Sequence, residues 1–134
     1  ANAHLAYQLF EEKFAGQRWE ALSQKGANKQ RPLWASTGVK DPAYPDTQYV
    51  IELIAPETVN TMPQSTLDAL IDHGEVRGNT ISGKYPQAVE VLKGLSTLGI
   101  SLDQITTDLE VDGVKKFAQA WDELLENVKA AQQS

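Results

Sequence analysis

Three consecutive residues and a nearby lysine have the types and spacing of an anion-binding loop. Ser36 and Thr37 supply hydroxyls, and Gly38 allows backbone N–H groups to approach a ligand closely. Lys40 adds a positive charge two residues further on. Hydroxyls, amides and a lysine at the C-terminal end of a strand suit an anion such as a phosphate. A strand followed by a turn with a solvated lysine fits the same residues, and on the pattern alone it is the commoner arrangement.

Two short apolar segments predict the strands that would position this loop. Residues 33–36 indicate a strand, and Pro32 suits its first position because that residue needs no donor to the ladder. Residues 58–62 indicate a second strand, since they are rich in β-branched side chains and are followed by Pro63.

Helical patterns follow both predicted strands. The first helix starts after Asp46 or Thr47 and continues to about residue 54, and the second covers residues 65–72. Gly74 is placed to end the second helix in the left-handed conformation. Strand, helix, strand and helix in this order form a βαβα unit with parallel strands, which belongs to the α/β class.

The remainder of the chain is mainly helical. A helix is predicted over residues 3–14, a second from Pro86 to near Gly99, and a third from a capping box at Ser101. Asp112 is expected to cap a fourth and longest helix. Its apolar stripe predicts a packed core face; the stripe comprises Val114, Phe117, Ala118, Trp121, Leu124, Leu125 and Val128.

Composition excludes several classes of function. The net charge of −6 argues against nucleic-acid binding, which needs a basic surface. Without cysteine there is no disulfide, zinc-thiolate or thiol chemistry. The longest apolar run, around residues 49–55, is short and contains Glu52, so no membrane span is expected. No cluster of metal ligands accompanies His4 or His73. We therefore expect an acidic cytoplasmic chain without metal or cofactor.

Three stretches closely resemble the C-terminal part of a transaldolase. They are QRPLWASTGVKDPAYPDTQYV (residues 30–50), ELIAPETVNTMPQSTLDALIDHG (52–74) and ANAHLAYQLFEEKFA (1–15). The resemblance is to the long bacterial form, which also occurs fused to glucose-6-phosphate isomerase. It implies the C-terminal part of a (β/α)8 TIM barrel: two short parallel strands plus a mainly helical remainder. On this basis the chain is one partial domain, with the last barrel units in residues 1–74 and C-terminal helices in 75–134.

The resemblance also implies an activity and its substrates. Transaldolases of the pentose phosphate pathway transfer a three-carbon dihydroxyacetone unit between sugar phosphates through a Schiff base. The implied partners are fructose 6-phosphate, sedoheptulose 7-phosphate, erythrose 4-phosphate and glyceraldehyde 3-phosphate. The family's Schiff-base lysine and its neighbouring carboxylates lie on earlier strands that this chain lacks, and a complete barrel needs about 250 residues. The chain alone is therefore expected to be inactive and to pair with the missing N-terminal part or with itself. Its first residue, Ala1, indicates a processed or partial chain.

Strands seven and eight of the implied barrel are residues 33–36 and 58–62, so Ser36 is the expected phosphate ligand. Lys40 is the expected cation, although the family's shorter forms carry an arginine closer to the serine. Thr37 and Gly38 complete the loop.

Three further residues are candidates for the sugar pocket. Strand alternation places Trp34 on the same side as Ser36. Asn60 or Thr61 could reach the pocket from the second strand. A stand-alone helical binding or interaction module without catalysis remains the alternative function.

Overall fold

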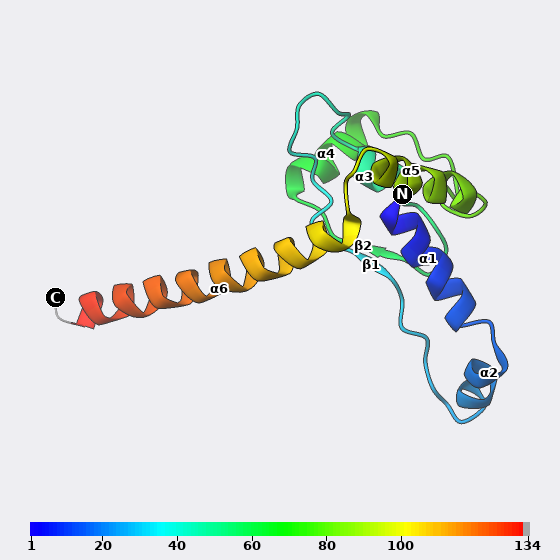
Figure 1. The fold of residues 1–134 in the computed structure, drawn as a ribbon, viewed down its shortest axis with the longest axis horizontal. Helices are drawn as coiled ribbons and strands as arrows, with labels where there is room; N and C mark the ends of the chain where they lie inside the picture. Colours follow the sequence, from blue (N-terminus) through cyan, green and yellow to red (C-terminus); the bar gives the residue numbers. More distant parts are fainter. Residues whose placement is uncertain (133–134) are drawn as a thin grey trace. The chain divides into compact units, whose positions relative to one another are not determined.

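The computed structural model describes residues 1–132 (Figure 1). The chain forms two compact units, which divide between Leu92 and Lys93. The boundary predicted after residue 74 separates barrel units from C-terminal helices. A division into compact units does not test which residues belong to the barrel, so this boundary stays a prediction.

The first unit contains most of the secondary structure. Its elements are α1 (Asn2–Lys13), α2 (Gln17–Ser23), β1 (Leu33–Trp34), α3 (Gln48–Ile51), β2 (Val59–Asn60), α4 (Gln64–His73) and the first part of α5 (Tyr85–Thr97). The predicted order of strand, helix, strand and helix is confirmed. α3 is shorter than expected, because it ends at Ile51 instead of continuing to residue 54.

β1 and β2 are parallel neighbours, as predicted (Figure 1). Leu33 pairs with Val59, and Trp34 pairs with Asn60. The ladder continues beyond the pairs, where the Thr61 N–H donates to the Trp34 carbonyl at 2.9 Å. The predicted strand over residues 33–36 is too long. Ser36 has φ of 56°, which is a left-handed conformation that extended backbone cannot contain.

Few side chains of the first unit are fully enclosed, and they come from distant parts of the chain. Its buried apolar residues are Tyr7, Val50, Ile51, Ile81 and Ala88. The Tyr7 hydroxyl donates to the Pro56 carbonyl at 3.0 Å, which ties α1 to the segment before β2. Ile81, in the segment between α4 and α5, is the most enclosed side chain of the described residues.

Gly74 ends α4 for a different reason from the one predicted. Its φ is −70° and its ψ is 129°, so the residue is extended and the predicted left-handed cap is wrong. A Cβ at this position would lie 2.4 Å from the Leu70 carbonyl oxygen. Glycine is therefore needed because the backbone approaches α4 closely, not because of its φ.

The second unit contains the end of α5 and the 31-residue helix α6 (Leu102–Gln132). The start at Ser101 is confirmed, because its Oγ accepts from the Gln104 N–H at 3.2 Å. The predicted new start at Asp112 is wrong. Asp112 lies inside the continuous helix and forms an ion pair with Lys116 at 2.6 Å.

The described part of α6 contains no buried residue. The predicted core stripe is instead exposed, with Phe117 82% and Trp121 59% accessible. Helical periodicity correctly indicated an apolar face, but the predicted burial of this face in a packed core is wrong. No helix within residues 1–132 is long and apolar enough to cross a membrane.

Candidate functional site

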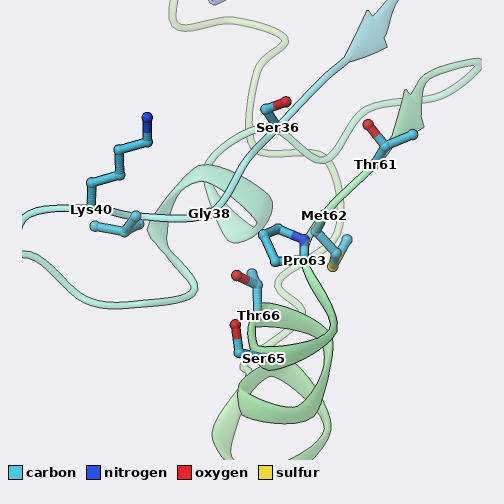
Figure 2. Close-up of a pocket in the computed structure, with 9 residues that line it drawn as sticks. Ser36, Gly38, Lys40, Thr61, Met62, Pro63, Ser65 and Thr66 are labelled. Atoms are coloured by element: carbon cyan, nitrogen blue, oxygen red, sulfur yellow. The ribbon is translucent and has the colours of Figure 1, made fainter. Parts of the chain in front are cut away.

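A cavity of about 560 Å³ lies where β1 and β2 end and α4 begins (Figure 2). The C-terminal ends of parallel strands are the usual position of ligand sites in α/β proteins. Hydroxyls, one lysine and small apolar side chains surround the cavity, and the lining residues are Ser36, Gly38, Val39, Lys40, Thr61, Met62, Pro63, Ser65 and Thr66.

The loop after β1 brings Ser36 and Lys40 to this cavity. The left-handed backbone of Ser36 ends the strand and reorients the side chains that follow. Lys40 is exposed, and no carboxylate within residues 1–132 lies at ion-pair distance from its ammonium group. Its charge is thus available to an anionic ligand. The predicted pair therefore lines a single cavity, together with Gly38 and Thr61.

Gly38 brings the loop into direct contact with the start of α4. A Cβ at Gly38 would lie 2.9 Å from Pro63 Cγ and 3.4 Å from Thr66 Oγ1. Real Cβ atoms essentially never approach as closely as the first distance, so a side chain here would push the loop from the helix. The absence of a side chain at Gly38 therefore helps to set the shape of the cavity.

Thr37 and Asn60 do not line the cavity but connect the ends of the two strands. The Thr37 hydroxyl is buried and lies 2.6 Å from Asn60 Oδ1. Its backbone N–H donates to the Thr61 carbonyl at 3.3 Å. Because a buried hydroxyl needs a partner, these contacts assign Thr37 the task of holding the strand ends in register.

Trp34 is also absent from the cavity lining. Its indole Nε1–H donates to the Leu53 carbonyl at 3.1 Å, which ties β1 to the segment after α3. The expectation that Trp34 and Ser36 share a side relied on strand alternation. That argument does not apply, because β1 ends at Trp34 and Ser36 is not extended.

Sequence analysis did not identify the α4 side of the cavity. Ser65 and Thr66 lie in the first turn of α4 and line the cavity opposite the loop (Figure 2). Two adjacent hydroxyl residues just after a strand, at the start of a helix, are a recognisable signal, because helix N-termini attract anions.

An exposed cluster connects α4 to the loop that follows Lys40. His73 Nε2 lies 2.9 Å from Asp46 Oδ1, and His73 Nδ1 lies 3.1 Å from Asp72 Oδ2. The hydrogen bond to Asp46 raises the pKa of His73, and the bond to Asp72 adds to this. The hydrogen bond from His73 lowers the pKa of Asp46. Among the described residues, no group of three or more histidine, cysteine, aspartate or glutamate side chains is placed to hold a metal ion.

None of the chain's lysines lies in an environment that would activate an amine. All of them are exposed. A lysine that forms a Schiff base needs a depressed pKa, which usually comes from burial or a second cation. The described residues therefore place no buried lysine beside the cavity.

These features define a class: a parallel α/β unit with a cavity lined by hydroxyls and a lysine at the C-terminal ends of its strands. Comparison with known sequences is more specific. The sequence model of the Transaldolase/Fructose-6-phosphate aldolase family matches residues 1–128, and the chain belongs to this family. The resemblance to a transaldolase is thereby confirmed.

Curated relatives support the same family. A transaldolase from Renibacterium salmoninarum is 60% identical over 131 residues, which are 98% of this chain and 35% of the relative. Transaldolase 1 from Streptomyces avermitilis is 59% identical over 128 residues, or 96% of this chain and 34% of the relative. A transaldolase from Acidothermus cellulolyticus is 60% identical over 124 residues, or 92% and 33%. The chain thus spans about a third of the length of these relatives.

Proposed function

We propose that this chain is the C-terminal part of a transaldolase, with β1 and β2 as the last two strands of a (β/α)8 barrel. The whole enzyme would transfer a dihydroxyacetone unit between sugar phosphates in the cytoplasm. The observation that carries the proposal is the cavity at the C-terminal ends of two parallel strands, in a chain that matches transaldolases over almost its full length.

In this proposal the chain contributes substrate binding instead of covalent chemistry. Ser36 and Lys40 hold the phosphate of the sugar, and Gly38 keeps the loop close enough to α4 to close the site. The remote phosphate supplies binding energy that positions the reacting carbonyl near an amine on another strand. Thr37 and Asn60 support the loop from beneath through their short hydrogen bond.

Substitution of Ser36 tests the phosphate grip in the longer protein. Ser36→Ala should raise KM for fructose 6-phosphate by roughly 10-fold, since a hydrogen bond to a charged group contributes about 1.5–3 kcal/mol. The kcat should change less, because the grip acts on substrate binding in the ground state and the transition state alike. Ser82→Ala, which lies outside the cavity, is the control. Unchanged kinetic constants in Ser36→Ala would remove this residue from the site.

Trapping with borohydride tests the division of labour between this chain and the rest of the enzyme. With fructose 6-phosphate, the longer protein should become labelled and the 134-residue chain should not, because all of its lysines are exposed. Mass spectrometry after digestion would locate the adduct. A substrate-dependent adduct on a lysine of this chain would contradict the proposal.

We also propose that the edges of β1 and β2 pair with strands of the missing N-terminal part or of another copy. Leu33 is 53% exposed and lines an apolar groove with Leu9, Phe10 and Phe14 of the α1 region. Short two-stranded sheets are marginal in water, and unpaired edges recruit strands. Light scattering at micromolar concentration should show association. A monomer with a cooperative melt would favour the alternative, a stand-alone module, for which the exposed apolar face of α6 would be the binding surface.

A further inference from the structure

Thr66 lines the cavity with a side chain that has little exposed surface and a hydroxyl without a partner in the described part of the chain. It is 6% exposed, so its side chain is almost completely buried. Its hydroxyl nevertheless makes no hydrogen bond within the part of the chain that the structure describes. The hydroxyl oxygen itself still has exposed surface, because the unpaired and fully buried side-chain polar atom among the described residues is Gln48 Oε1 and not Thr66 Oγ1. A hydroxyl that lines a cavity, keeps exposed surface and has no partner among the described residues is free to donate to a bound ligand.

The surroundings of Thr66 show the charge that such a partner would carry. Thr66 belongs to the first turn of α4, and Figure 2 shows its hydroxyl on the side of the cavity that faces the Gly38–Lys40 loop. The residue before this helix is Pro63, whose side chain cannot cap it, and no side-chain cap is present. The first N–H groups of α4, on Gln64 and Ser65, have no acceptor within the helix. Free N–H groups, the helix dipole and a hydroxyl donor together favour an anion.

Gly38 is the second observation that connects Thr66 to the site. The position of a Cβ at Gly38 would be only 3.4 Å from Thr66 Oγ1. The loop that carries Ser36 and Lys40 therefore packs beside the Thr66 hydroxyl without covering it. An anion held by Ser36 and Lys40 from one wall would meet the start of α4 on the other.

We infer that Thr66, with the free N–H groups at the start of α4, forms the second half of the phosphate site and donates its hydroxyl proton to a phosphate oxygen. The inference rests on the proposed phosphate grip and adds a binding residue to it. The ligand class is a sugar phosphate, and its dianionic phosphate group is the part that Thr66 contacts.

The inference predicts opposite effects on stability and binding. Valine has nearly the shape of threonine, so Thr66→Val removes the hydroxyl without opening a cavity. If the hydroxyl is unpaired in the free protein, the unliganded variant should melt at the same temperature as the wild type or higher. Its affinity for inorganic phosphate and for fructose 6-phosphate should fall roughly 10-fold, the effect of one lost hydrogen bond to a charged group. A threonine with a purely structural role would instead lower the melting temperature when replaced.

Calorimetric titration of the longer protein with inorganic phosphate, fructose 6-phosphate and fructose is the direct measurement. Thr66→Ser, which retains the hydroxyl, should keep phosphate affinity within about 3-fold of the wild type. Thr47→Val is the matched control. Thr47 is 4% exposed and precedes α3 without a side-chain cap, but it does not line the cavity. Fructose, which lacks phosphate, should bind the wild type and Thr66→Val equally weakly.

Wild-type affinity for phosphate in a folded Thr66→Val variant would overturn the inference, as would a lower melting temperature with unchanged affinity. If Thr66→Val does not fold, threonine-methyl NMR of the wild-type protein decides. The Thr66 methyl signal should move on phosphate addition and the Thr47 signal should not, and a stationary Thr66 signal would overturn the inference. Because none of these measurements uses turnover, a protein without ketol transfer would contradict the proposed function alone.

Discussion

The two compact units of this chain use apolar residues in different ways. In the unit of residues 1–92, a few side chains from four segments are enclosed, and Ile81 has no exposed surface. In the unit that begins at Lys93, α6 carries a more regular apolar stripe, yet none of its described residues is buried. Regular amphipathic spacing therefore shows which face of a helix is apolar, whereas burial depends on the partner that the tertiary structure supplies.

The same contrast applies to hydrogen bonds. The first unit is held by bonds between distant residues, such as Tyr7 to Pro56 and Trp34 to Leu53. α6 instead shows local side-chain bonds, such as the Asp112–Lys116 pair. Long-range contacts create a concave site with loops from several segments, and a helix with only local contacts cannot. This is the reason that the candidate site lies wholly in the first unit.

The largest expected effect is on core stability in the 134-residue chain. Ile81→Ala should destabilise the first unit by about 2–5 kcal/mol, because it opens a cavity at a fully enclosed position. Phe117→Ala, at a position that is 82% exposed, should change stability by no more than about 0.5 kcal/mol. Denaturant unfolding measures both. A loss at Phe117 as large as that at Ile81 would show that the α6 face is covered in solution.

Alanine substitutions at two glycines should change stability by an intermediate amount, in opposite directions. Gly74→Ala should destabilise the chain by about 1–3 kcal/mol, because the new Cβ would collide with the Leu70 carbonyl oxygen. Gly113→Ala should stabilise α6 by about 0.5–1 kcal/mol, because no atom crowds that position and alanine favours helix. Thermal melts followed by circular dichroism would show the two directions. If both variants changed the melting temperature equally and in the same direction, the expected difference between the crowded Gly74 and the open Gly113 would be wrong.

The smallest expected effect is the pH dependence of the His73 cluster. The pKa of His73 is raised above the ordinary value of 6.5, chiefly by its hydrogen bond to Asp46. Its stabilising contribution is therefore complete below pH 6.5 and is lost as the pH rises through the folded-state pKa. The pKa of Asp46 is lowered below 3.8, so its contribution is present above pH 3.8 and is lost as the pH falls through its own folded-state value.

The contact of His73 with Asp46 should thus be strongest between about pH 4 and pH 6.5. NMR titration of the His73 ring measures the raised pKa directly, and melts across the pH range measure its consequence. Asp46→Asn should return the His73 pKa toward 6.5 and flatten the stability profile. The effect should be small because all three side chains are largely exposed, and high salt should weaken it. A His73 pKa that is unchanged in Asp46→Asn would contradict the contact.

Local sequence patterns were enough to predict much of the fold. Apolar spacing indicated α1, α4 and α5, and the order of segments indicated a parallel pair of strands. Ser36 and Lys40 were recognisable because hydroxyl, glycine and lysine residues after a strand form a local motif, and the cavity does contain both. The family was also evident from the sequence of the loop and of the segment that follows it.

Other features depended on contacts between distant residues, which no local pattern reports. Asp112 has the chemistry of a helix cap, but the helix continues through it and through Gly113, and its carboxylate pairs with Lys116 one turn further along the same helix. Trp34 does not line the predicted pocket. Its indole N–H instead donates to the carbonyl of Leu53, 19 residues away in the sequence. Thr66 became a candidate ligand only when Gly38 placed the β1 loop beside α4. Periodicity and residue type specify which elements form, whereas burial, pairing and the walls of a cavity depend on which elements meet in space.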